Sequence, residues 1–226
     1  MALLPNLQKE SIRVAVFTDR LLSRLKPVKR VLQNLEKNGI KYELFDDVMI
    51  EPTNKSVVAA TDFLARLTQG FGCHAIVAVG GGSVIDTAKG ANLLSAPGID
   101  SSHIMDYVNA PIGKGRAIEN EQLRPLIAIP TTTGTGSETT GTVIFDIPEL
   151  KAKTGISHRK LKPNLALLEP ENSITQPTSV VTYSGFDVLW YISNVFFLLE
   201  SISPSFTAMH WNHSLLFLIT KESRDL

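Results

Sequence analysis

Two glycine-rich segments, each placed directly after an apolar run, carry residue types that bind phosphate groups. In "AIVAVGGGSVIDTAKG" the apolar run reaches Gly80 and continues into Gly81, Gly82 and Ser83. Glycine has no side chain to keep a phosphate away from the backbone amides, and a helix that begins there directs its first N–H groups at an anion. The segment therefore predicts a phosphate-binding turn.

The same segment also has a purely structural interpretation. Ser83 is followed three residues later by Asp86, so we expect Ser83 to cap the helix, with Asp86 completing a capping box. The segment does not have the G-x-G-x-x-G spacing of the dinucleotide-binding fingerprint. A tight turn with a cap and a phosphate-binding turn both remain open at this point.

The second segment, "IPTTTGTGSETTG" (129–141), contains six threonines together with Gly134, Gly136 and Gly141. A loop rich in hydroxyl groups and exposed backbone is suited to hydrogen-bonding a pyrophosphate or a ribose. The alternative is a surface loop without a ligand, because loops are often polar for reasons of solvation alone.

Two aspartates could complete such a site. Asp19 ends the apolar stretch 12–18, where an acid can accept hydrogen bonds from ribose hydroxyls and repel a 2′-phosphate; it also suits a helix N-cap, and the two roles are compatible. Asp187 follows a glycine at the start of the apolar segment "SGFDVLWYISNVFFLLESIS" (184–203). It is either an ordinary helix-start carboxylate or one part of a larger site.

The elements that must position these residues alternate between strand and helix. The hydrophobic spacing predicts strands at 12–18, 41–47, 74–80 and 125–130. It predicts helices at 20–39, 54–70 and 83–95. Two further short strand-like pieces lie at 142–146 and 165–168. This alternation predicts an α/β fold with a doubly wound parallel sheet, which binds ligands at the carboxyl ends of its strands.

Composition narrows the class of partner. The chain of 226 residues is 43% hydrophobic and 19% charged, an ordinary globular balance, and its 22 Lys and Arg equal its 22 Asp and Glu. Nothing electrostatic indicates nucleic acid or an anionic membrane surface. The single cysteine, Cys73, excludes an intrachain disulfide, suits a reducing compartment, and is expected to be a small buried residue rather than a nucleophile. The N-terminal segment contains no recognisable targeting signal.

Five short motifs resemble one family. In order and spacing, "VFTD", "AVGGGSVIDTAK", "PLIAIPTTTGTGSE", "KAKTGI" and "SGFDVL" are similar to the NAD-binding half of the iron-containing (group III) alcohol dehydrogenases. The segments "DYVNAPIGKG" and "TTTGTGSETTGTVIFD" are most similar to its hydroxyacid-oxoacid transhydrogenase branch. The resemblance runs from about residue 12 to about residue 189.

The resemblance implies an NAD site made of matched residues. Gly81, Gly82, Ser83 and Asp86 match the phosphate-binding turn, and Thr131, Thr132 and Thr135 match the threonine loop along the dinucleotide. Lys153 matches a cofactor-contacting lysine, and Asp19 matches the acid at the adenosine ribose.

The family also binds iron, or zinc in some members, through one aspartate and three histidines. The aspartate lies in a G-x-D-x-L-x-H segment, so Asp187 matches it, but Tyr191 stands where the family has its histidine. His210 and His213 have helical spacing, yet their context is unlike the family's ligand motifs and we do not expect them to bind metal. The sequence therefore predicts an incomplete metal site and a chain that does not hold the metal.

The resemblance also implies a domain organisation and a reaction. We expect an NAD-binding domain over 1–176 and the start of a helical metal-binding domain over 177–226, with a tail that diverges from residue 190, in a truncated or alternative form of the family protein. The family reaction is metal-dependent hydride transfer: 4-hydroxybutyrate and 2-oxoglutarate give succinic semialdehyde and 2-hydroxyglutarate, or an alcohol is oxidised.

The expected partners are small hydroxy acids and oxo acids, with no nucleic acid and no membrane, in mitochondria by resemblance. A homo-oligomer or pairing with a full-length subunit is compatible with the sequence. The main alternative is a non-catalytic nucleotide-binding fragment. A metal-dependent lyase of related fold, such as a dehydroquinate synthase, fits "PTTTGTGSE" and "SGFDVL" less well.

Overall fold

The computed structural model describes residues 12–70, 72–118, 122–174 and 176–202. Its centre is a sheet of five parallel strands in the order β2-β1-β3-β4-β7. The strands are β1 (Arg13–Phe17), β2 (Lys41–Phe45), β3 (Ala75–Gly80), β4 (Leu126–Pro130) and β7 (Leu165–Ala166). The predicted α/β class with a doubly wound parallel sheet is confirmed.

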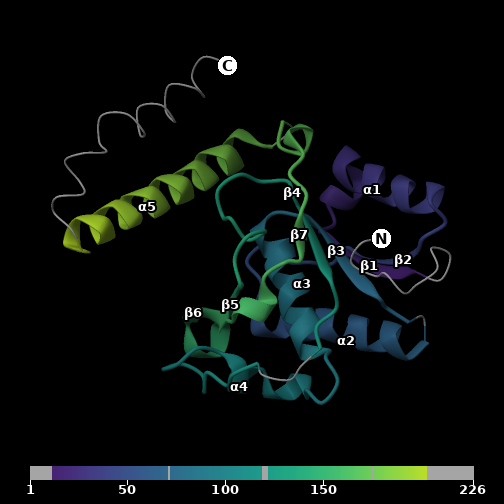
Figure 1. The fold of residues 1–226 in the computed structure, drawn as a ribbon, viewed down its shortest axis with the longest axis horizontal. Helices are drawn as coiled ribbons and strands as arrows, with labels where there is room; N and C mark the ends of the chain where they lie inside the picture. Colours follow the sequence, from purple (N-terminus) through teal and green to yellow (C-terminus); the bar gives the residue numbers. More distant parts are fainter. Residues whose placement is uncertain (1–11, 71, 119–121, 175, 203–226) are drawn as a thin grey trace.

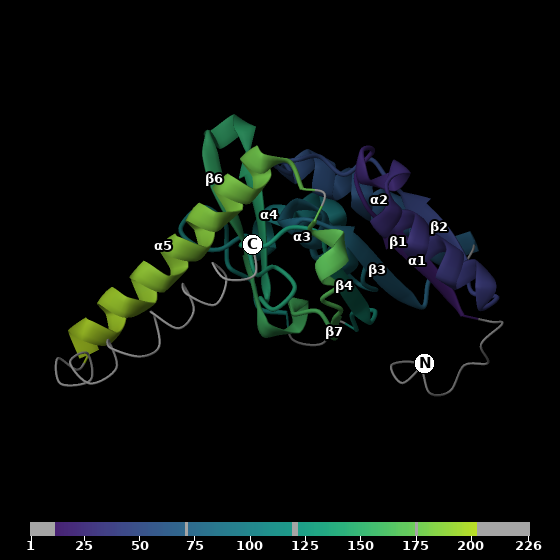
Figure 2. The same ribbon diagram turned by 90° about the horizontal axis from the view of Figure 1, so that it is seen from above.

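Helices cover both faces of this sheet (Figures 1 and 2). The α-helices of the described chain are α1 (Lys26–Lys37), α2 (Asn54–Gly70), α3 (Gly82–Leu94), the short α4 (Ile104–Tyr107) and α5 (Thr178–Ile202), of which α1 lies on one face of the sheet and α2 and α3 on the other. Side chains along a strand alternate between the two faces. Val14 and Val16 of β1 pack in the cluster that includes Val28 of α1, whereas Ala15 and Phe17 pack with residues of α2 and α3. All six residues of β3 are buried, as expected of a central strand covered on both faces.

A two-stranded antiparallel hairpin, β5 (Thr142–Ile147) and β6 (Ala152–Ser157), lies beside the main sheet. Val143 and Phe145 of β5 are fully buried in a cluster with Val57 of α2 and Leu93 of α3. The short strand expected at 142–146 is therefore present. Strand β6 was not predicted, because its sequence "AKTGIS" has only two apolar residues and depends on its pairing with β5.

The prediction of one helix over 20–39 is wrong for the first residues of that range. A short 3-10 turn, Leu22–Arg24, comes first, Leu25 is extended, and α1 begins at Lys26. Pro27 sits in the first turn of α1, where its missing N–H costs nothing, so the helix begins there rather than running through the proline. The piece expected at 165–168 is also shorter, because β7 has only two residues.

Helix α5 projects from the rest of the fold (Figures 1 and 2). Its large side chains are exposed, including Tyr183 at 72% and Trp190 at 68%. It begins one residue after the expected domain boundary at 176/177, but that division into domains stays a prediction. In the described part of the chain, no helix is both long enough and apolar enough to cross a membrane.

Candidate functional site

A cavity of about 580 Å³ lies at the carboxyl ends of β1, β3 and β4. The chain passes from β1 to β2 on one side and then to β3 on the other, which makes this the switch point where open parallel sheets bind ligands. Most of the residues proposed from the sequence line this one cavity: Asp19, Gly81, Gly82, Ser83, Thr131, Thr132, Thr135 and Asp187.

The glycine turn and the threonine loop are packed directly against each other. A Cβ at Gly81 would lie 3.2 Å from the side chain of Thr132, and a Cβ at Gly82 would lie 3.0 Å from that of Thr135. Gly81 is the N-cap of α3, and no acceptor in the described chain is bonded to the N–H groups of Gly82 and Ser83. The absence of side chains therefore lets the loop approach the turn and leaves helix N–H groups at the cavity for an anion.

The capping box expected at the start of α3 is wrong. The N-cap is Gly81 and no side chain caps it; Ser83 lies one residue inside the helix and lines the cavity. Asp86 does not line the cavity. Its buried carboxylate accepts hydrogen bonds from the N–H of Ile144 (3.0 Å) and from Nζ of Lys89 (3.2 Å).

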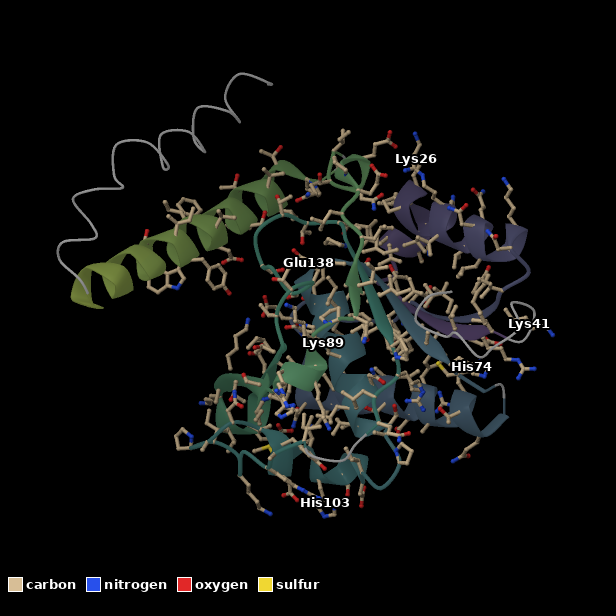
Figure 3. All side chains as sticks on the ribbon, in the orientation of Figure 1. Lys26, Lys41, His74, Lys89, His103 and Glu138 are labelled. Atoms are coloured by element: carbon tan, nitrogen blue, oxygen red, sulfur yellow. The ribbon has the colours of Figure 1, made fainter. Side chains whose placement is uncertain are left out.

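Asp86 and Lys89, both on α3, form a buried ion pair next to the end of the threonine loop. The Lys89 side chain has no exposed surface, and Figure 3 places it inside the fold. Its Nζ also donates to Oγ1 of Thr140 (3.3 Å) and to the carbonyl oxygen of Thr142 (2.9 Å). Burial raises the pKa of Asp86, an effect that the charge of Lys89 opposes, and burial lowers the pKa of Lys89. Through these hydrogen bonds the pair connects Thr140, at the end of the threonine loop, and β5 to α3, the helix that begins at the glycine turn.

Asp19 is not the N-cap of α1, which is Leu25, but it bonds to the turn that precedes that helix, and its role at a ribose stays a prediction. Its Oδ1 accepts hydrogen bonds from the N–H groups of Leu21 (2.9 Å) and Leu22 (2.8 Å), which starts the 3-10 turn after β1. The residue also lines the cavity. These two hydrogen bonds from the following backbone fix the orientation of the Asp19 carboxylate at the edge of the cavity.

Lys153 lies on β6 and does not line the cavity. Its ammonium is paired with the carboxylate of Glu51, which does line it. The hydrogen bond to Glu51 raises the pKa of Lys153, and the negative charges of Glu51 and Asp187 act in the same direction. Lys153 therefore lies near the edge of the cavity and contacts a lining residue, Glu51, without lining the cavity itself.

The expected metal ligand Asp187 lines the cavity from α5. Tyr191 lies one helical turn further along and is 56% exposed. No group of three His, Cys, Asp or Glu side chains within the described ranges could hold a metal ion, so the donors there do not fit iron or zinc. His210 and His213 lie outside the described residues.

Sequence reasoning missed one wall of the cavity and one contact that shapes it. The apolar wall comes from irregular segments and from α5, where no periodic pattern marks a binding role: Leu21, Leu25, Met49, Ile50, Val180 and Tyr183. Gly134, in the threonine loop, has φ +144°, and a Cβ there would lie 2.2 Å from the carbonyl oxygen of Ser184. The glycine-rich spacing of the loop was the available signal for this close approach to α5.

Comparisons with known proteins agree with this geometry. The family model described as "Iron-containing alcohol dehydrogenase" matches residues 2–170. The mitochondrial hydroxyacid-oxoacid transhydrogenase of Xenopus laevis is 57% identical over 176 residues, and that of Homo sapiens is 48% identical over the same length. Each alignment covers 78% of this chain but only 36% of the relative.

Solved structures agree as well. An alcohol dehydrogenase from Oenococcus oeni matches 78% of this chain with a TM-score of 0.66 and 28% identity. Sulfoacetaldehyde reductase from Bifidobacterium kashiwanohense, solved in complex with NAD+, matches 79% with a TM-score of 0.63 and 28% identity. In both cases the match covers 43% of the solved chain. The chain belongs to the iron-containing alcohol dehydrogenase family.

Proposed function

We propose that the cavity at the carboxyl ends of β1, β3 and β4 binds NAD, and that this chain is the nucleotide-binding part of a hydride-transfer enzyme. The observation that carries the proposal is the convergence of the glycine turn, the threonine loop and Asp19 on one cavity of about 580 Å³. These groups come from three different strand ends, and their chemistry suits phosphate and ribose.

Each part of the cavity suits a different part of a dinucleotide. The N–H groups of Gly82 and Ser83 and the hydroxyls of the threonine loop are donors for the pyrophosphate. Asp19 accepts from ribose hydroxyls and disfavours a 2′-phosphate by charge repulsion, which selects NAD over NADP. The apolar wall is suited to the rings. Bound NAD would supply hydride transfer at its nicotinamide.

Asp86 and Lys153 act indirectly in this proposal. The Asp86–Lys89 pair holds the threonine loop in register with α3, and Lys153 holds Glu51 at the cavity rim. Direct contact of Lys153 with the cofactor would require its ammonium to leave Glu51.

For the whole protein, we propose the reaction named for its relatives, hydroxyacid-oxoacid transhydrogenation, in mitochondria. The assignment to 4-hydroxybutyrate and 2-oxoglutarate rests on family resemblance. This chain spans 36% of the length of those relatives, so their activity does not extend to it directly.

For the chain by itself, we propose nucleotide binding without hydride transfer. Tyr191 replaces the family histidine, and the described donors do not fit a metal. Its activity would then depend on a family-like metal-binding domain, in a full-length subunit with which it pairs or as a further part of its own chain.

The nucleotide site is tested by calorimetric titration of NAD into the purified chain and its Gly81→Val variant. A β-branched side chain at Gly81 would collide with Thr132 and block the N–H groups, so we expect no measurable binding. Gly70→Val is the matched control, because a Cβ there meets nothing within 4 Å and Gly70 lies at the end of α2. Unchanged affinity in a folded Gly81→Val protein would exclude this cavity as the NAD site.

Metal analysis and a hydride-transfer assay test the second part of the proposal. The purified chain should contain no stoichiometric iron or zinc and should not oxidise 4-hydroxybutyrate in the presence of 2-oxoglutarate. One metal ion per chain together with turnover would contradict the non-catalytic role.

A further inference from the structure

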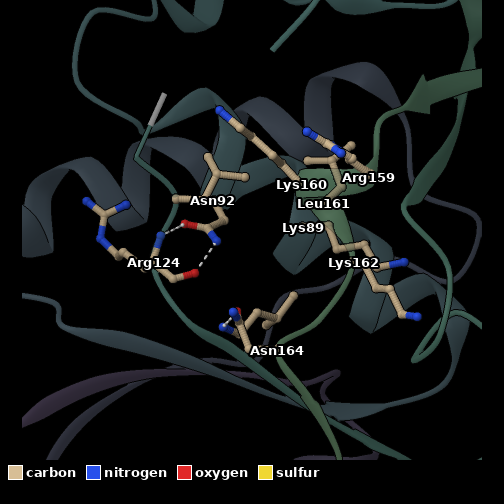
Figure 4. A pocket seen from close by; sticks show the side chains of 10 residues that line it. Lys89, Asn92, Arg124, Arg159, Lys160, Leu161, Lys162 and Asn164 are labelled. Atoms are coloured by element: carbon tan, nitrogen blue, oxygen red, sulfur yellow. Dashed lines mark hydrogen bonds between the residues drawn. The ribbon is translucent and has the colours of Figure 1, made fainter. Parts of the chain in front are cut away.

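A second cavity, of about 310 Å³, lies at the opposite end of the sheet, where β4 and β7 begin (Figure 4). Ten residues line it, and none of the ten is acidic. Five are basic: Lys89, Arg124, Arg159, Lys160 and Lys162. In a chain with equal numbers of acidic and basic residues, this concentration of one sign of charge around a hollow requires an explanation.

Two of the five cations are engaged in building the cavity wall. Lys89 is paired with Asp86. The guanidinium of Arg124 donates to the carbonyl oxygen of Cys73 and to the hydroxyls of Ser95 and Thr68, and Figure 4 shows it directed away from the cavity. These contacts hold the cavity wall in place. The positive charge at the opening of the cavity therefore comes from other residues.

The charge at the opening comes from the 3-10 turn Arg159–Leu161 and the residue after it. Arg159 and Lys162 are exposed, and neither side chain has an ion pair or hydrogen bond within the part of the chain that the structure describes. These two side chains are therefore available to a ligand at the cavity.

The polar floor presents a donor as well. Asn92 is held by two hydrogen bonds with the backbone of Arg124, drawn in Figure 4. Asn164 uses its amide oxygen to accept from the N–H of Leu126 at 2.9 Å, so its N–H₂ group remains as a donor. Three leucines line the rest, namely Leu123, Leu126 and Leu161.

We propose that this cavity binds a small organic anion with at least two negative charges, either a phosphorylated metabolite or a di- or tricarboxylate. Arg159 and Lys162 would pair with its charges, since guanidinium and ammonium groups form strong charge-assisted hydrogen bonds with phosphate and carboxylate. Asn164 would donate to an anionic oxygen, and the leucines would contact the carbon body. The site lies at the end of the sheet remote from the proposed NAD cavity and does not depend on it.

The probes are citrate and pyrophosphate, titrated into the purified chain by calorimetry at constant ionic strength set with sodium chloride. We expect saturable binding with one anion per chain. In Arg159→Gln/Lys162→Gln, affinity should fall at least about tenfold, because both opening charges are removed. Both residues are exposed, so this variant should keep its fold, as circular dichroism would verify.

Lys37→Gln/Lys41→Gln is the matched control. It removes the same charge from exposed positions at the end of α1 and the start of β2, which is the opposite edge strand of the sheet from β7 (Figure 3 labels Lys41). Affinity should stay within about twofold of the parent chain. Tighter binding of pyrophosphate than of citrate would assign the site to phosphates, and the reverse order to carboxylates.

The proposal is overturned by any of three results: no saturable binding of either anion, equal affinity in the parent chain and in Arg159→Gln/Lys162→Gln, or an equal loss in both double variants. The last result would mean that only the net charge of the chain matters.

Discussion

The buried pair of Asp86 and Lys89 gives a sharp test of how the threonine loop is held. In Lys89→Met the ammonium is lost, and with it the hydrogen bonds to Thr140 and Thr142. The carboxylate of Asp86, only 8% exposed, is left without a cation. Removing one partner of a buried ion pair typically costs about 3–5 kcal/mol of folding free energy.

Part of this cost should depend on pH, and its sign can be worked out. Burial already raises the pKa of Asp86 above its ordinary value of 3.8, and loss of Lys89 removes the charge that opposes that rise. A carboxyl whose folded pKa is raised favours folding below its unfolded pKa and loses that contribution as pH rises. In the folded variant the protonated form of Asp86 is favoured, so the cost of Lys89→Met should be smaller at low pH and should increase as pH rises above the ordinary pKa of the carboxyl.

The assay is urea unfolding of the parent chain and Lys89→Met at pH 5, 6 and 7. The difference in unfolding free energy should increase from pH 5 to pH 7, because the raised pKa of Asp86 disfavours its charged form in the folded state. Adding Asp86→Asn to Lys89→Met should remove the pH dependence and recover much of the stability, because the amide oxygen can still accept from the N–H of Ile144. A difference that is constant with pH, or below about 1 kcal/mol at pH 7, would refute the reasoning.

Three further predictions concern the candidate site. Asp19→Ala should narrow the preference for NAD over NADP, measured as the ratio of the two dissociation constants, and should cost about 0.5–2 kcal/mol of stability through loss of the bonds to the following turn; an unchanged ratio would leave Asp19 with only its capping role. Gly134→Ala should separate the threonine loop from α5, because its Cβ would collide with Ser184, and should increase hydrogen exchange at the start of α5. Tyr191→His by itself should not create stoichiometric metal binding by elemental analysis, since a catalytic site normally needs about three protein ligands.

Much of the sheet could be predicted because its signals are local. The apolar run at 75–80 and the helix from Asn54 to Gly70 are each specified by their own residues, and both match the structure closely. The two loops of the candidate site could be predicted for the same reason, since a run of glycines or threonines after a buried strand indicates the carboxyl end of that strand.

The rest depended on contacts that the local pattern does not encode. The periodicity of 20–39 suggested one helix, but Pro27 determined where it begins. Strand β6 exists only through its pairing with β5. The spacing of Ser83 and Asp86 fits a capping box. In the structure, however, the carboxylate of Asp86 accepts a hydrogen bond from the backbone N–H of Ile144, 58 positions away in sequence. Only the fold brings these groups together.

These contacts also bear on which activities of the family can exist in this chain. The glycine turn is held against Thr132 and Thr135 by close packing, and the far end of the same loop is fastened to α3 through Lys89. These groups lie on α3 and on the loop that joins β4 of the parallel sheet to β5 of the hairpin. Asp187, in contrast, is carried by α5, which projects from that core and meets the threonine loop at Gly134. Phosphate binding at the glycine turn should therefore tolerate changes in α5 that leave Gly134 in contact, whereas metal binding by Asp187 requires further ligands that the described residues do not supply.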